Sequence, residues 1–189
     1  MKIKGTTKRA GKRPNFWGRY EKKIPESVKD LIYHHYYSFE TLYVYCDCSM
    51  QIEKNLMSIA CSYVHNGSVI VESNVIYPPK DCKGKNIYGE LQAIISSLCN
   101  FETHLNSFIK NIVIYSDVNN ITEILTYKLN FNKVFSLSNT QAELIHLFEN
   151  KQIQNPNLEI SIKYLPKILR ANNPFAKSAH NAARKVLQK

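Results

Sequence analysis

Three acidic residues of this chain stand beside apolar segments in a way that could support chemistry. Asp47 follows the segment 43–46, Asp117 follows the segment 112–116, and Glu90 opens an apolar helical stripe. An unpaired carboxylate costs several kcal/mol to bury, so a strand that ends in Asp usually places it at a sheet edge or in a site. Three carboxylates from two strands and one helix can converge on a divalent cation, which prefers oxygen ligands. Such a cation site would decide whether the protein is a nuclease.

Elements that must position these residues follow from the apolar pattern. The expected strands are 41–47, 57–65, 68–77, 111–115 and 158–164. The expected helices are 26–37, 87–102, 118–128, 139–150 and 174–187. Asn66-Gly67 between two β-rich runs predicts a two-residue hairpin. Three meandering strands, followed by strands that helices separate, predict an α/β fold with a mixed five-stranded sheet covered on both faces.

Positive charge is concentrated near the N-terminus. The net charge is +10 over 189 residues, and residues 1–23 hold nine of the 25 lysines and arginines but only one acidic residue. Such clustering is typical of a tail that binds phosphates, and the alternatives are a solubilising tail or one attracted to ribosomes or membranes. We expect contacts to nucleic acid from Lys8, Arg9, Lys12, Arg13 and Arg19.

Domain limits follow from the change in composition. We expect a basic flexible arm over 1–23, a short helical extension over 24–40 and one domain over 41–189. Phe16, Trp17 and Tyr20 interrupt the arm. These aromatic residues either stack on bases or anchor the arm to the domain.

Other classes of protein are disfavoured by the composition. No apolar run approaches the roughly 20 residues that span a membrane. No apolar stretch follows the basic N-terminus as it would in a secretory signal, so we expect a cytoplasmic protein without a membrane partner. The five cysteines form no paired CxxC set, which favours reduced, buried thiols over a zinc site.

Three short strings, in their order and spacing, resemble motifs of the ribonuclease H family. Asp47-Cys48-Ser49 resembles the Asp-x-Ser after its first strand, and Glu90-Leu91-Gln92-Ala93 resembles its helical Glu-Leu-x-Ala. Tyr115-Ser116-Asp117 resembles the Ser-Asp that closes its fourth strand. The resemblance covers residues 41 to about 187. It implies a ribonuclease H-like fold, with three antiparallel strands and then parallel ones, flanked by helices.

The resemblance also implies an activity and a cofactor. In such enzymes two Mg²⁺ (or Mn²⁺) ions lie about 4 Å apart between the carboxylates. Asp47 would bridge both ions, while Glu90 and Asp117 would each bind one of them. The implied reaction is hydrolysis of the RNA strand of an RNA/DNA hybrid, recognised by backbone shape and 2′-hydroxyl groups. Purely structural alternatives are a helix N-cap for Asp117 and a solvent-facing helical position for Glu90.

A departure from the family pattern concerns its fourth carboxylate, which comes from the last helix. An ungapped alignment from Asn173 puts Lys177 at that position, whereas an alignment on Ala179-His180 puts His180 there. We prefer His180 as a catalytic residue, because an imidazole can bind a metal or carry a proton. The alternatives are a helical histidine without a chemical role, or Lys177 at the fourth position, which would suggest a site that has lost a metal.

Basic residues near the same end are expected to contact the phosphate backbone, namely Lys167, Arg170 and Lys177.

Three functions stay open on these observations. The first is a nuclease of ribonuclease H type. The second is a non-catalytic nucleic-acid-binding protein on the same fold, which the missing carboxylate and the basic arm favour. The third is a structure-specific DNA endonuclease, which a histidine-containing site would allow.

Overall fold

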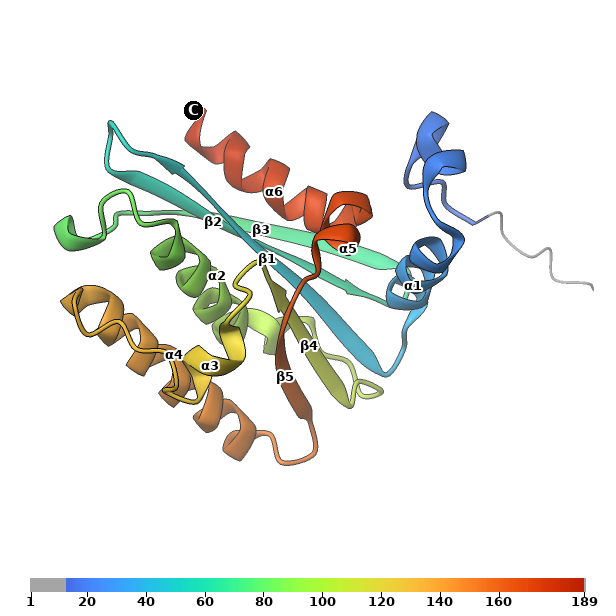
Figure 1. The fold of residues 1–189 in the computed structure, drawn as a ribbon. Helices are drawn as coiled ribbons and strands as arrows, with labels where there is room; N and C mark the ends of the chain where they lie inside the picture. Colours follow the sequence, from blue (N-terminus) through green and yellow to red (C-terminus); the bar gives the residue numbers. More distant parts are fainter. Residues whose placement is uncertain (1–12, 189) are drawn as a thin grey trace, which may run out of the picture.

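A five-stranded sheet forms the centre of the computed structural model, which describes residues 13–188 (Figure 1). The strands are β1 (Thr41–Gln51), β2 (Leu56–His65), β3 (Ser68–Ile76), β4 (Asn111–Ser116) and β5 (Glu159–Tyr164). Their spatial order is β3-β2-β1-β4-β5. The β1–β2 and β2–β3 pairs are antiparallel, whereas β4 is parallel to both β1 and β5. The predicted mixed sheet, three antiparallel strands followed by parallel ones, is therefore confirmed.

Two residues form the turn between β2 and β3, as the sequence predicts. Asn66 and Gly67 have φ angles of 46° and 74°. Positive φ at both central positions is typical of the type I′ turn, whose twist matches that of the flanking strands. The turn sets the register in which His65 pairs with Ser68.

Helices cover both faces of the sheet. One face carries α2 (Asn86–Asn100), with α3 (Ile121–Leu125) and α4 (Phe135–Gln154) beside it, over the larger apolar core. The other face carries α1 (Glu26–Tyr37) and α6 (Pro174–Leu187), as Figure 1 shows. Ala179 and Ala183 of α6 pack against Ala60 of β2, and such small side chains let the helix lie close to the strands. No helix within residues 13–188 is both long and apolar enough to cross a membrane.

Several element boundaries differ from the prediction. The expectation that Asp47 ends the first strand is wrong, because β1 continues to Gln51 by pairing with β2. The helix α4 begins at Phe135 rather than 139, and α3 has only five residues. A short helix, α5 (Lys167–Asn172), replaces the expected loop before α6. Pro166 precedes α5 and suits a helix start, but six residues are too few to show helical periodicity.

The described part of the expected N-terminal arm packs against the domain. A 3-10 helix spans Gly18–Lys23. The Phe16 ring lies 5.2 Å from the ring of Phe175 in α6, measured between centroids. The Trp17 indole N–H donates a hydrogen bond to the backbone oxygen of Asn172 at 2.7 Å. Phe16 and Trp17 thus anchor this segment. Lys8, Arg9 and Lys12 lie outside the described residues, and the domain limits stay a prediction.

Candidate metal centre

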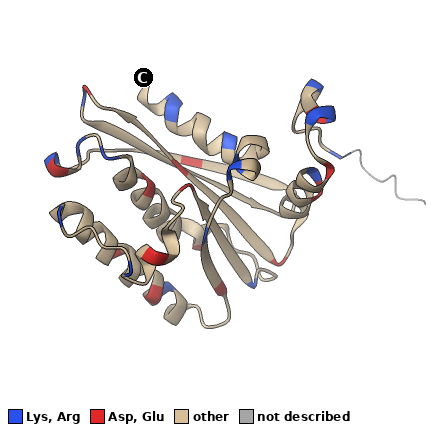
Figure 2. Cartoon of the chain, viewed as in Figure 1, with Lys and Arg blue, Asp and Glu red and all other residues tan. Residues whose placement is uncertain are grey.

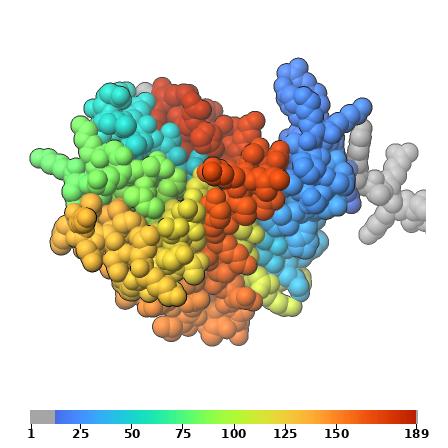
Figure 3. All heavy atoms as spheres, viewed as in Figure 1, coloured from blue at the N-terminus to red at the C-terminus, as the bar shows by residue number. Residues whose placement is uncertain are grey.

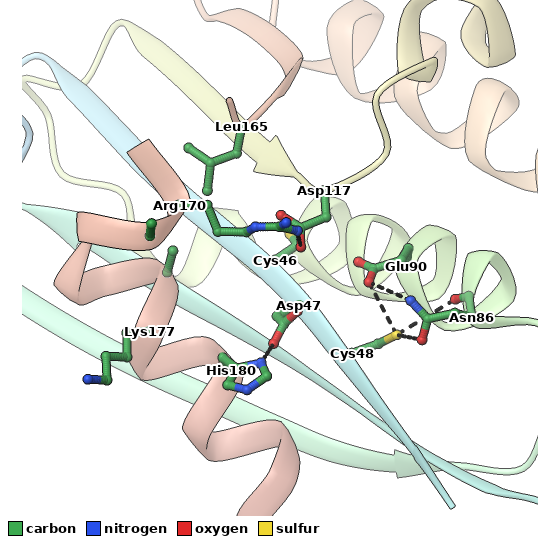
Figure 4. Close-up of a pocket in the computed structure, with 12 residues that line it drawn as sticks. Cys46, Asp47, Cys48, Asn86, Glu90, Asp117, Leu165, Arg170, Lys177 and His180 are labelled. Atoms are coloured by element: carbon green, nitrogen blue, oxygen red, sulfur yellow. Dashed lines mark hydrogen bonds and ion pairs between the residues drawn. The ribbon is translucent and has the colours of Figure 1, made fainter. Parts of the chain in front are cut away.

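The three carboxylates come together, as the sequence predicts. One oxygen of each of Asp47, Glu90 and Asp117 lies within 4.8 Å of the others (Figure 4). The sheet explains this convergence. The pairing of β4 with β1 stops at Tyr115 and Tyr45, so β1 has an open edge at Asp47, and Asp117 follows β4 directly. Glu90 belongs to α2, which covers the face of the sheet that does not carry α1 and α6, and its side chain reaches the same edge.

Gly89 allows α2 to approach β1 closely enough for Glu90 to reach the cluster. A Cβ atom at Gly89 would lie 2.8 Å from the Cys48 sulfur and 3.0 Å from its Cβ. Glycine inside a helix costs about 1 kcal/mol relative to alanine, so it usually has a packing reason. Gly89 is not among the residues predicted from the sequence, although a glycine beside a candidate catalytic residue in a helix was the available signal.

Glu90 is a buried carboxylate, with 5% of the residue exposed. Its Oε1 accepts a hydrogen bond from the Asn86 amide at 3.1 Å and lies 3.5 Å from the Cys48 sulfur. Its Oε2 is buried without a hydrogen-bond partner. Burial, together with the negative charges of Asp47 and Asp117, raises the pKa of Glu90 to about 8. A buried oxygen without a partner beside two further carboxylates fits a hard divalent cation such as Mg²⁺ or Mn²⁺.

Asp47 has a partner on α6. The Nδ1 atom of His180 lies 2.7 Å from Oδ2 of Asp47. Burial raises the pKa of Asp47, and the neighbouring His180 opposes that rise. Of the two alignments considered for the last helix, the one on Ala179-His180 therefore names the residue that contacts the cluster. Lys177 points away from the carboxylates, as Figure 4 shows.

Asp117 forms an ion pair with Arg170 of α5. This short helix, which the sequence pattern did not predict, thus brings a guanidinium to the edge of the cluster. The residues predicted to contact phosphate lie in different places. Arg170 pairs with a carboxylate, and Lys177 lines the cavity into which the cluster opens. Lys167 is exposed and does not line that cavity. Arg13 and Arg19 are exposed on the N-terminal segment.

The cluster opens into a cavity of about 470 Å³. Its lining contains the three carboxylates and three basic side chains, those of Arg170, Lys177 and His180. Its volume falls within the range of roughly 300–1,000 Å³ that is usual for small-ligand sites. Such a cavity can hold a cation at its carboxylates and a phosphate at its basic side chains.

No protein-family model and no curated protein sequence matches this chain. Solved structures do match it. Ribonuclease H1 from the halophilic archaeon Halobacterium salinarum NRC-1 aligns with a TM-score of 0.53 and 17% identity, covering 78% of this chain and 98% of that one. LC11-RNase H1, isolated from compost by a metagenomic approach, aligns with a TM-score of 0.55 and 16% identity, over 79% of this chain and 99% of its own.

A further structure shows LC11-RNase H1 in complex with an RNA/DNA hybrid. It aligns with a TM-score of 0.54 and 16% identity, over 77% of this chain and 99% of that one. Sequence identities this low support a conclusion about the fold alone. The strand order and these alignments together show that this chain has a ribonuclease H-like fold.

Proposed function

We propose that this protein is a metal-dependent endonuclease of ribonuclease H type that hydrolyses the RNA strand of RNA/DNA hybrids. The convergence of Asp47, Glu90 and Asp117 within 4.8 Å supports the proposal most strongly. Carboxylate clusters that hold two divalent cations are a common means of phosphodiester hydrolysis. The hybrid bound to the similar LC11-RNase H1 supports the substrate class.

Each residue of the cluster has a role in this proposal. Asp47, Glu90 and Asp117 would hold Mg²⁺ or Mn²⁺, which supplies positive charge to activate the attacking water and stabilise the leaving oxygen. His180 donates from Nδ1 to Asp47 and thereby orients that carboxylate. The half-exposed imidazole can also accept or return a proton at its other nitrogen.

Positive charge beside the cluster would hold the phosphate backbone. Figure 2 shows lysines and arginines on α5, on α6 and on the N-terminal segment. Charge-assisted contacts to phosphate oxygens position a duplex without reading its sequence. The residues proposed for this role are Lys8, Arg9, Lys12, Arg13, Arg19, Lys167, Arg170 and Lys177.

A second function, nucleic-acid binding without catalysis, is favoured by one observation. Two carboxylates of the cluster already have protein partners, because Arg170 pairs with Asp117 and His180 pairs with Asp47. A guanidinium beside Asp117 can neutralise charge that a cation would otherwise neutralise. On this alternative the protein would hold a duplex and leave it intact.

Cleavage assays separate these functions. Labelled RNA/DNA hybrid, duplex DNA and branched DNA are incubated with the protein in Mg²⁺ or Mn²⁺, and a parallel reaction contains EDTA. We expect cleavage of the hybrid alone, and a loss of about 100-fold or more in Asp47→Asn because a cation ligand is removed. Asp30→Asn, an exposed carboxylate on α1, is the matched control.

The remaining outcomes each point elsewhere. Hybrid cleavage that survives in Asp47→Asn at the wild-type rate contradicts the metal centre. Binding of every substrate without cleavage in either metal favours the non-catalytic protein. Cleavage of branched DNA in preference to hybrid favours a structure-specific DNA endonuclease.

A further inference from the structure

A second cavity lies next to the metal centre, between the N-terminal segment and the junction of α5 with α6. Its volume is about 560 Å³. Ala171 and Lys177 line both cavities, so the two adjoin along this junction. Figure 3 shows the blue N-terminal segment standing beside the orange-red residues of this part of the chain. A ligand that leaves the metal centre past Lys177 would enter this second cavity.

Aromatic side chains form one wall of the second cavity. Trp17 is held in place by its hydrogen bond to Asn172 and by the edge-on ring of Phe16, whose centroid lies 5.9 Å away. Tyr20 is 51% exposed and also lines the cavity. A fixed indole and an accessible phenol form a surface on which nucleic-acid bases can stack, whatever their sequence.

Lys177 brings a positive charge to the cavity lining, and two further cations lie beside Tyr20 without lining the cavity. The Arg19 guanidinium lies 5.0 Å, and the Lys23 ammonium 5.8 Å, from the centre of the Tyr20 ring. Lys177 forms no ion pair within residues 13–188. Ser178 and Asn181 add hydroxyl and amide groups to the lining. None of the described lining residues is acidic, so the charge favours an anionic ligand.

We propose that this cavity binds unpaired nucleotides of a single-stranded nucleic acid that continues from a duplex at the metal centre. Bases would stack on Trp17 and Tyr20, and Lys177 would contact the backbone where the two cavities adjoin. The preferred substrate would then carry a single-stranded flank beside the scissile bond. This preference rests on the proposed nuclease function, whereas binding of the single strand does not.

Tryptophan fluorescence tests the binding directly, because Trp17 is the only tryptophan of the chain. The full chain is titrated in EDTA with oligothymidylate and with oligouridylate of about ten nucleotides, within the range of known single-strand sites. We expect saturable quenching, and a dissociation constant raised about fivefold or more in Tyr20→Ala through loss of one stacked base. The two oligonucleotides show whether the cavity takes DNA, RNA or both.

Tyr77→Ala is the matched control, since Tyr77 is 77% exposed and lines neither cavity. Lys177→Gln is a second variant, for which we expect a smaller dependence of binding on salt. Absence of quenching, or equal affinities of Tyr20→Ala and Tyr77→Ala, overturns the proposal. Circular dichroism of each variant verifies that its fold is intact.

Cleavage measurements then test the proposed single-strand cavity and the proposed nuclease function independently of each other. The ratio of kcat/KM for a tailed hybrid over that for a blunt hybrid is measured, and we expect this ratio to exceed one and to fall toward one in Tyr20→Ala. Quenching without any cleavage would uphold the cavity and contradict the nuclease. Cleavage with equal rates on both substrates and no quenching would uphold the nuclease and contradict the cavity.

Discussion

The imidazole of His180 lies against the carboxylate of Asp47, with Nδ1 2.7 Å from Oδ2. The two residues are 133 positions apart in the sequence, and their contact joins the last helix to the first strand. A histidine at this place leaves the cluster with three carboxylates. It also lowers the negative charge around Asp47 whenever the imidazole is protonated.

Substitution of His180 should show whether this residue orients Asp47 or is a helical histidine without a chemical role. We expect His180→Ala to lower the rate of hybrid cleavage about 10- to 100-fold, as is typical when the partner of a metal ligand is lost. His180→Asp would supply a fourth oxygen ligand and retain more activity than His180→Ala. Lys185→Ala, an exposed change on the same helix, is the control. Equal activities of His180→Ala and the control would mean that His180 has no role.

Addition of Mg²⁺ should stabilise the protein through Glu90. At about 100 times its dissociation constant, a bound ion adds about 2.7 kcal/mol to the free energy of unfolding. For a chain of this size that corresponds to a Tm increase of about 5–10 °C. We expect scanning fluorimetry to show this increase in wild type and a much smaller one in Glu90→Gln, compared with the exposed Glu53→Gln.

The unfolding temperatures of wild type and Glu90→Gln are also compared in EDTA. At about pH 9, Glu90→Gln should be more stable than wild type without metal, because the Glu90 carboxyl, whose pKa is about 8, is then ionised beside two further carboxylates in a buried position. A Tm shift with Mg²⁺ that is equal in wild type and Glu90→Gln would contradict the assignment of Glu90 as a ligand.

Gly89→Ala should destabilise the contact between α2 and β1. The added methyl would lie 2.8 Å from the Cys48 sulfur, and overpacking of this kind costs about 1–3 kcal/mol. Urea unfolding in EDTA measures the loss. The double variant with Cys48→Ala should recover part of it, because the closest atom is then removed. Additive effects of the two substitutions would show that this clash does not cause the loss.

Burial of His35 predicts a decrease in stability at acidic pH. Its Nδ1 lies 2.5 Å from the Tyr45 hydroxyl, and burial lowers the pKa of His35 to about 3. The unfolded chain takes up a proton near pH 6.5 and the folded chain does not. The contribution of the neutral His35 is therefore complete above about pH 6.5 and is lost progressively below it, by up to about 1.4 kcal/mol per pH unit.

Urea unfolding from about pH 7.5 down to about pH 5 tests this prediction. We expect the free energy of unfolding of His35→Phe to fall less steeply with decreasing pH than that of wild type. His34→Gln, at the exposed neighbouring position, should retain most of the wild-type slope. Parallel curves for wild type and His35→Phe would contradict the prediction.

Removal of residues 1–12 should weaken nucleic-acid binding in a salt-dependent way. The deletion takes away five basic side chains and leaves Phe16 and Trp17 in place. Each phosphate contact that is lost lowers the slope of log K against log salt by about 0.9 on duplex DNA. Binding titrations at several salt concentrations measure that slope, and an unchanged slope would mean that this segment does not contact the backbone.

Local patterns in the sequence determine much of this protein. Alternation of apolar residues and the Asn66-Gly67 turn predict the strands and the hairpin, because both depend on neighbouring residues alone. The order of Asp47, Glu90 and Asp117 along those elements predicts the carboxylate cluster. The resemblance of their motifs to the ribonuclease H family predicts the fold that the solved structures match.

Tertiary packing decided the rest. The choice between His180 and Lys177 depends on how α6 lies on β1 and β2, which its alanines set. The pairing of Arg170 with Asp117 depends on a helix too short to leave a periodic signal. The second cavity exists because Phe16 and Trp17 anchor the N-terminal segment beside α6. Each of these contacts joins residues that are distant in the chain, and only the packed fold brings such residues together.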